Sequence, residues 1–181
     1  AQGYDALYSN TTGYYNSAQG AYALYANTTG DSNSVLGYNA LRSNTTGNSN
    51  SALGYAALRS NTTGFQNSAQ GFQALYSNTT GYYNSALGVN ALYYNTTGAG
   101  NSGVGYFTGT GLNDTNPDER SVIDNYSTFV GYNAGRDGAV ASTTVLTGAS
   151  ALGYNARAGA NYSMALGGLG SYAVRVGIAS S

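Results

Sequence analysis

The stretch that decides the fold is NSALGYAALRSNTTG, residues 50–64, because nearly the same stretch occurs before and after it. NSVLGYNALRSNTTG occupies residues 33–47, and NSALGVNALYYNTTG occupies residues 84–98. The shared unit is G-x-x-A-L-x-x-N-T-T-G-x-x-N-S-x-x, seventeen residues long, and its six full copies run from residue 3 to residue 104. Its first glycines recur at equal steps, at Gly3, Gly20, Gly37, Gly54, Gly71, Gly88 and Gly105. A fixed period of this kind is the signature of a repeat architecture.

The length of the unit selects the kind of repeat. Seventeen residues are too few for a pair of packed helices, which need more than about 30, and glycine and asparagine at fixed places disfavour any helix. We therefore predict an all-β parallel solenoid in which each unit forms one coil of two short strands and two turns. The expected strands are NSALGY and ALYSN, and the expected turns lie at TTG and around the third residue of the unit. We number unit positions from 1, at the first glycine, to 17.

Side-chain alternation along a strand predicts which rows of residues face outward. If the alanine at position 4 fills the interior, the leucine at position 5 points to the opposite face and needs cover from another chain. This row is the predicted oligomer ladder, and it consists of Leu7, Leu24, Leu41, Leu58, Leu75 and Leu92. The row at position 17 also needs cover from another chain. It consists of Leu36, Leu53, Leu87 and Val104, although Gln19 and Gln70 interrupt it. An apolar row on a rod favours a homo-oligomer with the row at its axis. The sequence leaves open which row lies there.

Composition excludes several classes of function. The chain has 181 residues, a formal net charge of −1 and 7% charged residues, and it contains no Cys, His or Trp. Without cysteine there is no disulfide or thiolate metal site, and without His, Cys or Lys the usual bases and nucleophiles are missing. We predict no enzymatic activity, no cofactor and no bound metal. The charge balance gives no reason to expect nucleic acid, and no apolar run is long enough to span a membrane. Because the chain begins within a unit, we expect it to be a segment of a longer protein.

The NTT triplets have two interpretations. Each has the form of an N-glycosylation acceptor, and the asparagines concerned are Asn10, Asn27, Asn44, Asn61, Asn78 and Asn95. Asn113, Asn125 and Asn161 head similar triplets outside the regular units. The structural alternative is a polar row at a turn, in which asparagine caps backbone groups and the glycine that follows adopts a positive φ.

The threonines and tyrosines also form rows. Regular threonine arrays suggest ice binding, but an array on one strand face needs T-x-T, whereas these threonines are adjacent and precede glycine. Position 6 carries Tyr8, Tyr25, Arg42, Arg59, Tyr76 and Tyr93. These side chains either stack on sugar rings of a receptor or stack on one another, with arginine adding cation–π contacts. We favour the second interpretation.

The regular pattern divides the chain into three parts: residues 1–105 with regular units, an irregular insert at 106–128, and a continuation of the roll at 129–181. The insert holds Asp114, Pro117, Asp118, Glu119 and Asp124. These residues suit a solvated loop with a contact from Asp118 or Glu119 to Arg120. A calcium loop or a receptor-facing knob is the alternative, although the usual calcium-loop spacing is missing.

Residues 150–167, SALGYNARAGANYSMALG, differ from the units before them because the step from Gly153 to Gly167 is shorter, fourteen instead of seventeen. This stretch resembles the head repeat of the trimeric autotransporter adhesins, the YadA-like family, whose unit reads roughly N-S-x-A-x-G-x-x-A-x-A-x-G-x-x. The matching residues are Ser150, Ala151, Gly153, Ala156, Ala158, Gly159, Ser163, Ala165 and Gly167. The resemblance implies a left-handed parallel β-roll, three of which pack into a trimer. The last stretch, SMALGGLGSYAVRVGIASS, is similar to the end of such rolls in phage tail-fibre-like proteins with a C-terminal intramolecular chaperone.

These observations together predict a structural segment of an extracellular fibre, stalk or adhesin head, on a cell surface or in a phage tail fibre. Its expected partners are further copies of itself, as a homotrimer or filament, and a host surface glycan or receptor. Two alternatives remain: a glycan-coated filament of single-chain solenoids, and an ice-binding solenoid.

Overall fold

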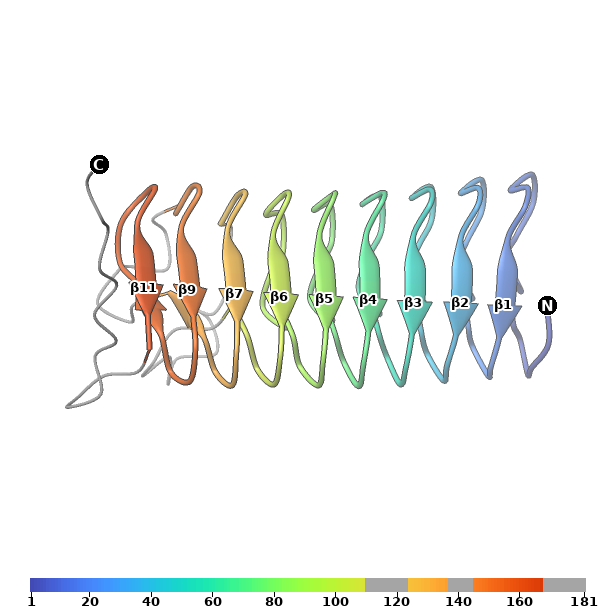
Figure 1. Ribbon diagram of the computed structural model, residues 1–181. Coiled ribbons are helices and arrows are strands. Elements are labelled where there is room, and N and C mark those ends of the chain that lie inside the picture. The colour runs from blue at the N-terminus through green and yellow to red at the C-terminus, as the bar shows by residue number, and fades with distance from the viewer. Residues whose placement is uncertain (110–123, 137–144, 168–181) are drawn as a thin grey trace.

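The computed structural model describes residues 1–109, 124–136 and 145–167, and within these the chain is all-β and contains no helix. Nine short strands lie side by side in one parallel sheet and form a straight rod (Figure 1). Six of them come from the regular units: β1 (Ser17–Gln19), β2 (Ser34–Leu36), β3 (Ser51–Leu53), β4 (Ser68–Gln70), β5 (Ser85–Leu87) and β6 (Ser102–Val104). The sheet continues through β7 (Thr128–Val130), β9 (Ser150–Leu152) and β11 (Met164–Leu166). The predicted parallel β-solenoid is confirmed.

Each coil lies on equivalent residues of the next coil. Ser17 pairs with Ser34, and Leu36 pairs with Leu53, so the register repeats with the same step as the sequence unit. The later steps differ in length, because Ser102 pairs with Thr128, Thr128 with Ser150, and Ser150 with Met164. Side-chain hydrogen bonds between these coils span the same sequence separations of 26, 22 and 14. Extra residues between strands therefore leave the sheet register unchanged.

The predicted second strand, ALYSN, is wrong for the regular units. These residues form turns, and the leucine at position 5 has a positive φ, for example 53° at Leu24. In the described part of the chain, a second strand occurs in later coils, where β8 (Gly135–Arg136) pairs with β10 (Arg157–Ala158). The turn backbones are still hydrogen-bonded between coils, as when the Leu41 N–H donates to the Ala57 carbonyl at 2.9 Å. Each coil therefore needs its neighbour to satisfy its backbone.

The core is thin and is built from three apolar rows. Alanine at position 4, leucine at position 5 and the small residue at position 16 point inward, as Ala40, Leu41 and Ala52 do in one unit. Phe129 occupies position 16 of the unit in which position 5 is Gly109, and it is fully buried with its ring beside that glycine. A larger residue at one position thus compensates for the missing leucine at another.

Left-handed backbone conformations recur in every regular coil, mostly on residues other than glycine. Position 3 (Asn39, φ 55°), position 5 (Leu41, φ 49°) and position 13 (Ser49, φ 56°) all have them, as does the glycine at position 1 (Gly37, φ 148°). The glycine of NTTG does not have a positive φ, so the predicted reason for its presence is wrong. It is needed for space, because a Cβ on Gly64 would collide with Asn61 Oδ1 and the Gly81 carbonyl oxygen.

Candidate functional surface

The predicted oligomer ladder at position 5 is wrong, because these leucines lie inside the coil. Leu24, Leu41, Leu58 and Leu75 are completely buried and Leu92 almost so, while Leu7 in the first coil is half-buried against the same core. The positive φ at this position turns the chain, so the leucine faces inward like the alanine before it. These side chains need no cover from another chain.

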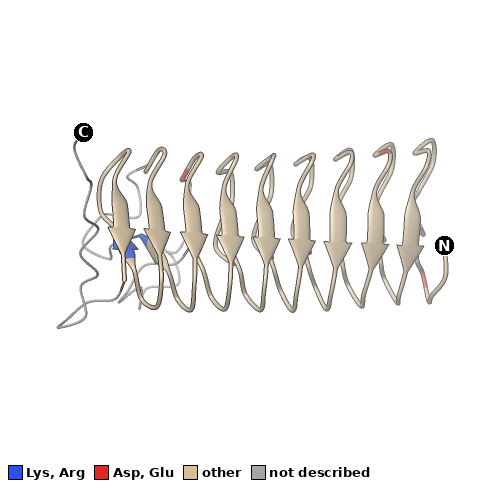
Figure 2. Cartoon of the chain, in the orientation of Figure 1, with Lys and Arg blue, Asp and Glu red and all other residues tan. Residues whose placement is uncertain are grey.

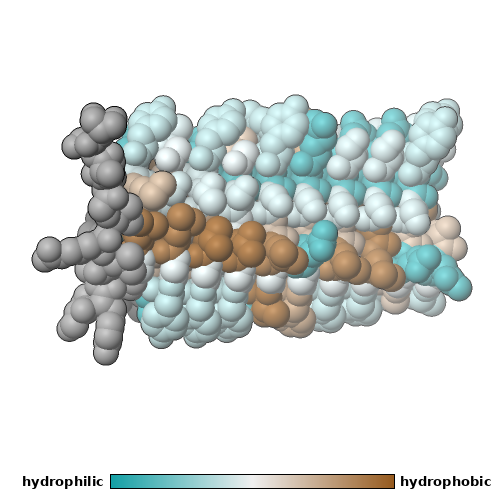
Figure 3. All heavy atoms as spheres, in the orientation of Figure 1, coloured by the Kyte–Doolittle hydropathy of each residue, from teal (hydrophilic) through white to brown (hydrophobic). Residues whose placement is uncertain are grey.

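The apolar row at position 17 is the one that faces outward. Its exposed fractions are 49% for Leu36, 45% for Leu53, 50% for Leu87, 41% for Val104 and 37% for Val130. Together with Gln19, Gln70, Leu152 and Leu166 these residues form the row that we call the apolar ridge. Figure 3 shows it as a brown band along the rod, interrupted by hydrophilic residues.

The face that carries the apolar ridge is regular and uncharged. The strand residue at position 15 is serine in β1 to β6, and it points outward two residues before the ridge, as Ser34 does before Leu36. Figure 2 shows no charged residue on any strand from β1 to β7. A long face with an apolar row, a hydroxyl row and no charge has no electrostatic barrier to packing against its own copy.

The asparagines of the NTT triplets lie in the interior. Asn27 is fully buried, and its Nδ2 donates to Asn10 Oδ1 at 2.7 Å and to the Gly30 carbonyl at 2.9 Å. The same two bonds recur at Asn44, Asn61, Asn78 and Asn95. A glycan would replace one of these protons and would need space that the core lacks. The glycosylation hypothesis is therefore incompatible with the folded coil at these five residues. Asn10, in the first coil, is half-buried and caps Gly13 in the same way.

A second buried amide row runs beside the first, at position 14. Asn33 donates from its backbone N–H and its Nδ2 to Asn16 Oδ1, at 3.0 and 3.1 Å, and from Nδ2 to the Gly47 carbonyl. The row continues through Asn50, Asn67, Asn84 and Asn101. The sequence alone does not separate this row from the turn. Its signal was the invariant Asn-Ser pair, whose asparagine precedes a strand that begins at serine.

Other predicted polar residues are spread over the surface. Asn161 is exposed and its Oδ1 accepts the Thr147 N–H, Asn125 is half-buried, and Asn113 lies outside the described residues. The first threonine of the first five triplets donates its hydroxyl to the next coil, as Thr28 does to the Thr45 carbonyl at 3.0 Å. The second threonine is exposed and forms a single row at the turn. Neighbouring T-x-T rows, which we expect of an ice-binding face, do not occur in the regular coils.

The predicted stacking at position 6 is confirmed. The rings of Tyr8 and Tyr25 stack with centroids 5.3 Å apart, and Tyr76 stacks on Tyr93 at 4.9 Å. The guanidinium of Arg59 lies 5.5 Å from the Tyr76 ring centroid and donates a hydrogen bond to its hydroxyl. The rings therefore stabilise neighbouring coils, by about 0.5–1.5 kcal/mol for each pair.

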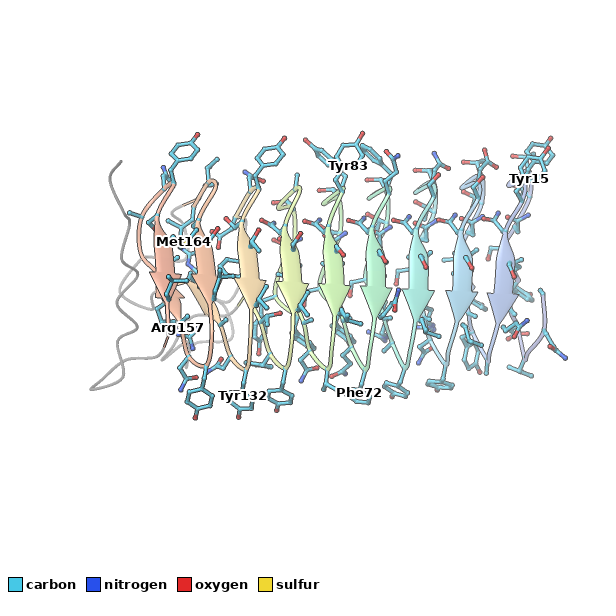
Figure 4. All side chains as sticks on the ribbon, viewed as in Figure 1. Tyr15, Phe72, Tyr83, Tyr132, Arg157 and Met164 are labelled. Carbon is cyan, nitrogen blue, oxygen red and sulfur yellow. The ribbon has the colours of Figure 1, made fainter. Side chains whose placement is uncertain are left out.

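A second aromatic row lies at position 2 and was missed from the sequence. Tyr38, Tyr55 and Phe72 stack in turn with centroids 5.4 and 5.0 Å apart, and Tyr106, Tyr132 and Tyr154 do so at 5.1 and 5.3 Å. In Figure 4 Phe72 and Tyr132 lie along one edge of the rod, whereas Tyr15 and Tyr83 lie along the opposite edge. Its signal in the sequence is the aromatic residue that follows the first glycine of most units, as in Gly37-Tyr38 and Gly71-Phe72.

Of the four acidic residues of the insert, the structure describes Asp124. Asp114, Asp118 and Glu119, with Pro117 and Arg120, lie outside the described residues, as does most of the last stretch, residues 163–181. Asp124 is described and is fully buried, 3.4 Å from Arg136, and its Oδ1 accepts the Leu146 N–H. Burial raises the pKa of Asp124, while Arg136 and this hydrogen bond oppose the shift. Among the described residues no group of acids could hold a metal ion.

Comparison with known proteins found no match among family models, curated proteins or solved structures. In the part of the chain that the structure describes, no helix could cross a membrane.

Proposed function

We propose that this chain is a structural segment of an extracellular fibre, stalk or adhesin head, in which rods associate along their apolar ridges. The resemblance of residues 150–167 to YadA-like head repeats supports a homotrimer on a cell surface or in a phage tail fibre. In such an assembly the segment holds a terminal attachment site away from the surface. A host glycan or receptor is the expected partner of the whole fibre.

The observation that carries the proposal is the choice of residues in the apolar ridge. Gln19 and Gln70 occupy ridge positions in β1 and β4, and both strands keep the register of their neighbours. The coil therefore folds with a polar residue there. Leu36, Leu53, Leu87, Val104 and Val130 are nevertheless each exposed by more than a third. Within one chain these apolar side chains are not needed for folding, whereas contact with another copy would bury them.

Symmetry links the ridge to a closed assembly. The ridge runs along the whole described sheet, so parallel rods that share one axis bury it over its full length. A cyclic arrangement closes and limits the number of subunits. Burial of a leucine that is now half exposed contributes roughly 1 kcal/mol, and the contribution is repeated in most coils of every rod.

The test uses a substitution that the chain already tolerates. The double variant Leu53→Gln/Leu87→Gln places at β3 and β5 the residue that occurs naturally at β1 and β4. We expect light scattering after gel filtration to give the mass of a trimer for the unmodified chain and a smaller mass for the variant. The far-ultraviolet circular dichroism should be the same for both proteins.

The matched control is Thr46→Gln/Thr63→Gln, which adds the same side chains at exposed turn positions away from the ridge. This control should keep the mass of the unmodified chain. The ridge is not the interface if the ridge variant has the same oligomeric mass as the unmodified chain. A monomeric unmodified chain contradicts self-association of this segment, and a continuous distribution of masses favours the single-chain filament.

A further inference from the structure

Among the described residues, five tyrosine pairs stack face to face between neighbouring coils. Their ring centroids are 4.9 to 5.4 Å apart and their planes are within 17° of parallel. The pairs are Tyr8–Tyr25, Tyr38–Tyr55, Tyr76–Tyr93, Tyr106–Tyr132 and Tyr132–Tyr154. The rings of the position 2 row are about half exposed, so dissolved reagents can reach them. Phenol rings held this close are each other's coupling partners once the side chains rotate to bring two ring carbons together.

The composition directs one-electron oxidation to these rings. Tyrosine accounts for 19 residues, while cysteine and tryptophan, which compete with it for a one-electron oxidant, are both absent. The single methionine is Met164, and it reacts instead by oxygen addition to its sulfur. For a radical formed on one of these rings, the nearest side chain that can react is therefore another tyrosine.

We infer that the stacked tyrosines are sites of dityrosine cross-linking between coils, formed by hydrogen peroxide and a phenol-oxidising haem peroxidase. Each of two phenols loses one electron and one proton, and the two phenoxyl radicals form a carbon–carbon bond between ring carbons adjacent to the hydroxyl-bearing carbons. The hydrogen on each of these carbons then moves to the phenol oxygen, which restores both aromatic rings. The pair loses two hydrogens in total, and one peroxide is reduced to two waters.

The stacking pattern fixes which pairs can react. Tyr55 has Tyr38 on one side and Phe72 on the other, so it can be linked in one direction only. Tyr82 stacks on Phe65 and has no tyrosine partner in that stack. Tyr154 stacks on Tyr132. Each cross-link joins adjacent coils, so it would hold the rod together where separate coils would otherwise fray.

Trypsin separates these pairs into different peptides. Cleavage after Arg42, Arg59, Arg120, Arg136 and Arg157 gives the peptides 1–42, 43–59, 60–120, 121–136 and 137–157. Tyr55 is the only tyrosine of peptide 43–59, and Tyr154 is the only one of peptide 137–157. After treatment of the folded chain with haem peroxidase and hydrogen peroxide, we expect 43–59 linked to 1–42, and 137–157 linked to 121–136. Each linked pair should weigh two hydrogens less than its parts and show dityrosine fluorescence.

Two substitutions that change one exposed hydroxyl each test the geometry. Tyr38→Phe should remove the link between 1–42 and 43–59 and leave the link between 121–136 and 137–157. Phe72→Tyr should add a link between 43–59 and 60–120 that the unmodified chain does not form. Both keep an aromatic ring in the row, so the coil should remain folded, which circular dichroism can confirm. Cross-linking should also raise the melting temperature of the unmodified chain.

The same treatment in denaturant is the reference for random coupling. The inference is overturned if the folded and denatured chains give the same linked peptides, or if Phe72→Tyr adds no link. It is also overturned if all dityrosine joins separate molecules, as exposed Tyr15 could do, which a denaturing gel would show as multiples of the chain mass.

Discussion

Replacement of Asn61 by alanine removes one side-chain amide from the buried asparagine row at position 8. In the folded coil Asn61 Nδ2 donates to Asn44 Oδ1 at 2.8 Å and to the Gly64 carbonyl at 2.9 Å, and its Oδ1 accepts from Asn78 Nδ2 at 2.8 Å. The Gly64 carbonyl keeps a second donor, because Asn50 Nδ2 also binds it. Asn44 Oδ1 and one Asn78 N–H lose the partner that Asn61 supplied.

The expected loss of stability follows from these two groups. Each buried polar group left without a partner costs about 1–3 kcal/mol, so Asn61→Ala should lower the free energy of unfolding by roughly 2–6 kcal/mol. The measurement is urea unfolding followed by far-ultraviolet circular dichroism. Thr63→Ala is the control, because Thr63 is exposed two residues away, and it should change stability by less than about 0.5 kcal/mol. Equal midpoints for the two variants would mean that the amide row does not support the coil.

Two further predictions concern the backbone and the buried ion pair. Ser49→Asn should stabilise the rod by roughly 0.5–1 kcal/mol in thermal unfolding, because asparagine tolerates the left-handed φ of 56° better than serine does. The control is Thr46→Asn, at a residue where φ is not positive. A comparable gain in stability from this control would contradict the reason given. Because burial raises the pKa of Asp124 in the folded state, its contribution to stability is full below the unfolded pKa of about 4 and is lost as pH rises through the folded pKa. The urea midpoint of the unmodified chain should therefore fall over this range relative to that of Asp124→Asn, and parallel pH profiles would refute the assignment.

Much of the architecture could be predicted because the repeat constrains it strongly. A seventeen-residue period with glycine and asparagine at fixed positions leaves few options other than a solenoid coil, and equivalent residues then form parallel rows. The strand at NSALGY and the stacking of Tyr76 on Tyr93 follow from that arrangement. The different coil lengths after residue 105 did not obscure the sheet, because added residues lie between strands rather than within them.

The chemical role of the asparagines was harder to predict. A polar residue in a turn is usually exposed, and the triplet Asn61-Thr62-Thr63 has the form of a glycan acceptor. In a solenoid, however, the neighbouring coil supplies a second amide at the spacing of adjacent strands. An amide can donate to one neighbour and accept from the other, so a stacked row satisfies itself in the interior. Residue type alone does not distinguish this row from a surface row.

The wrong prediction for the leucine row at position 5 shows where the alternation of side chains along a strand does not apply. Alternation assigns opposite faces to Ala57 and Leu58 only if both are extended. Leu58 instead has φ 52°, and both side chains point into the core. A left-handed conformation costs a residue other than glycine roughly 1–2 kcal/mol, while full burial of a leucine contributes about 1.5–3 kcal/mol. The coil therefore gains by turning at this leucine rather than exposing it. The apolar ridge has no such turn, since Leu53 lies within an extended strand and keeps its outward direction. Its exposure is fixed by the strand, and only another molecule can cover it.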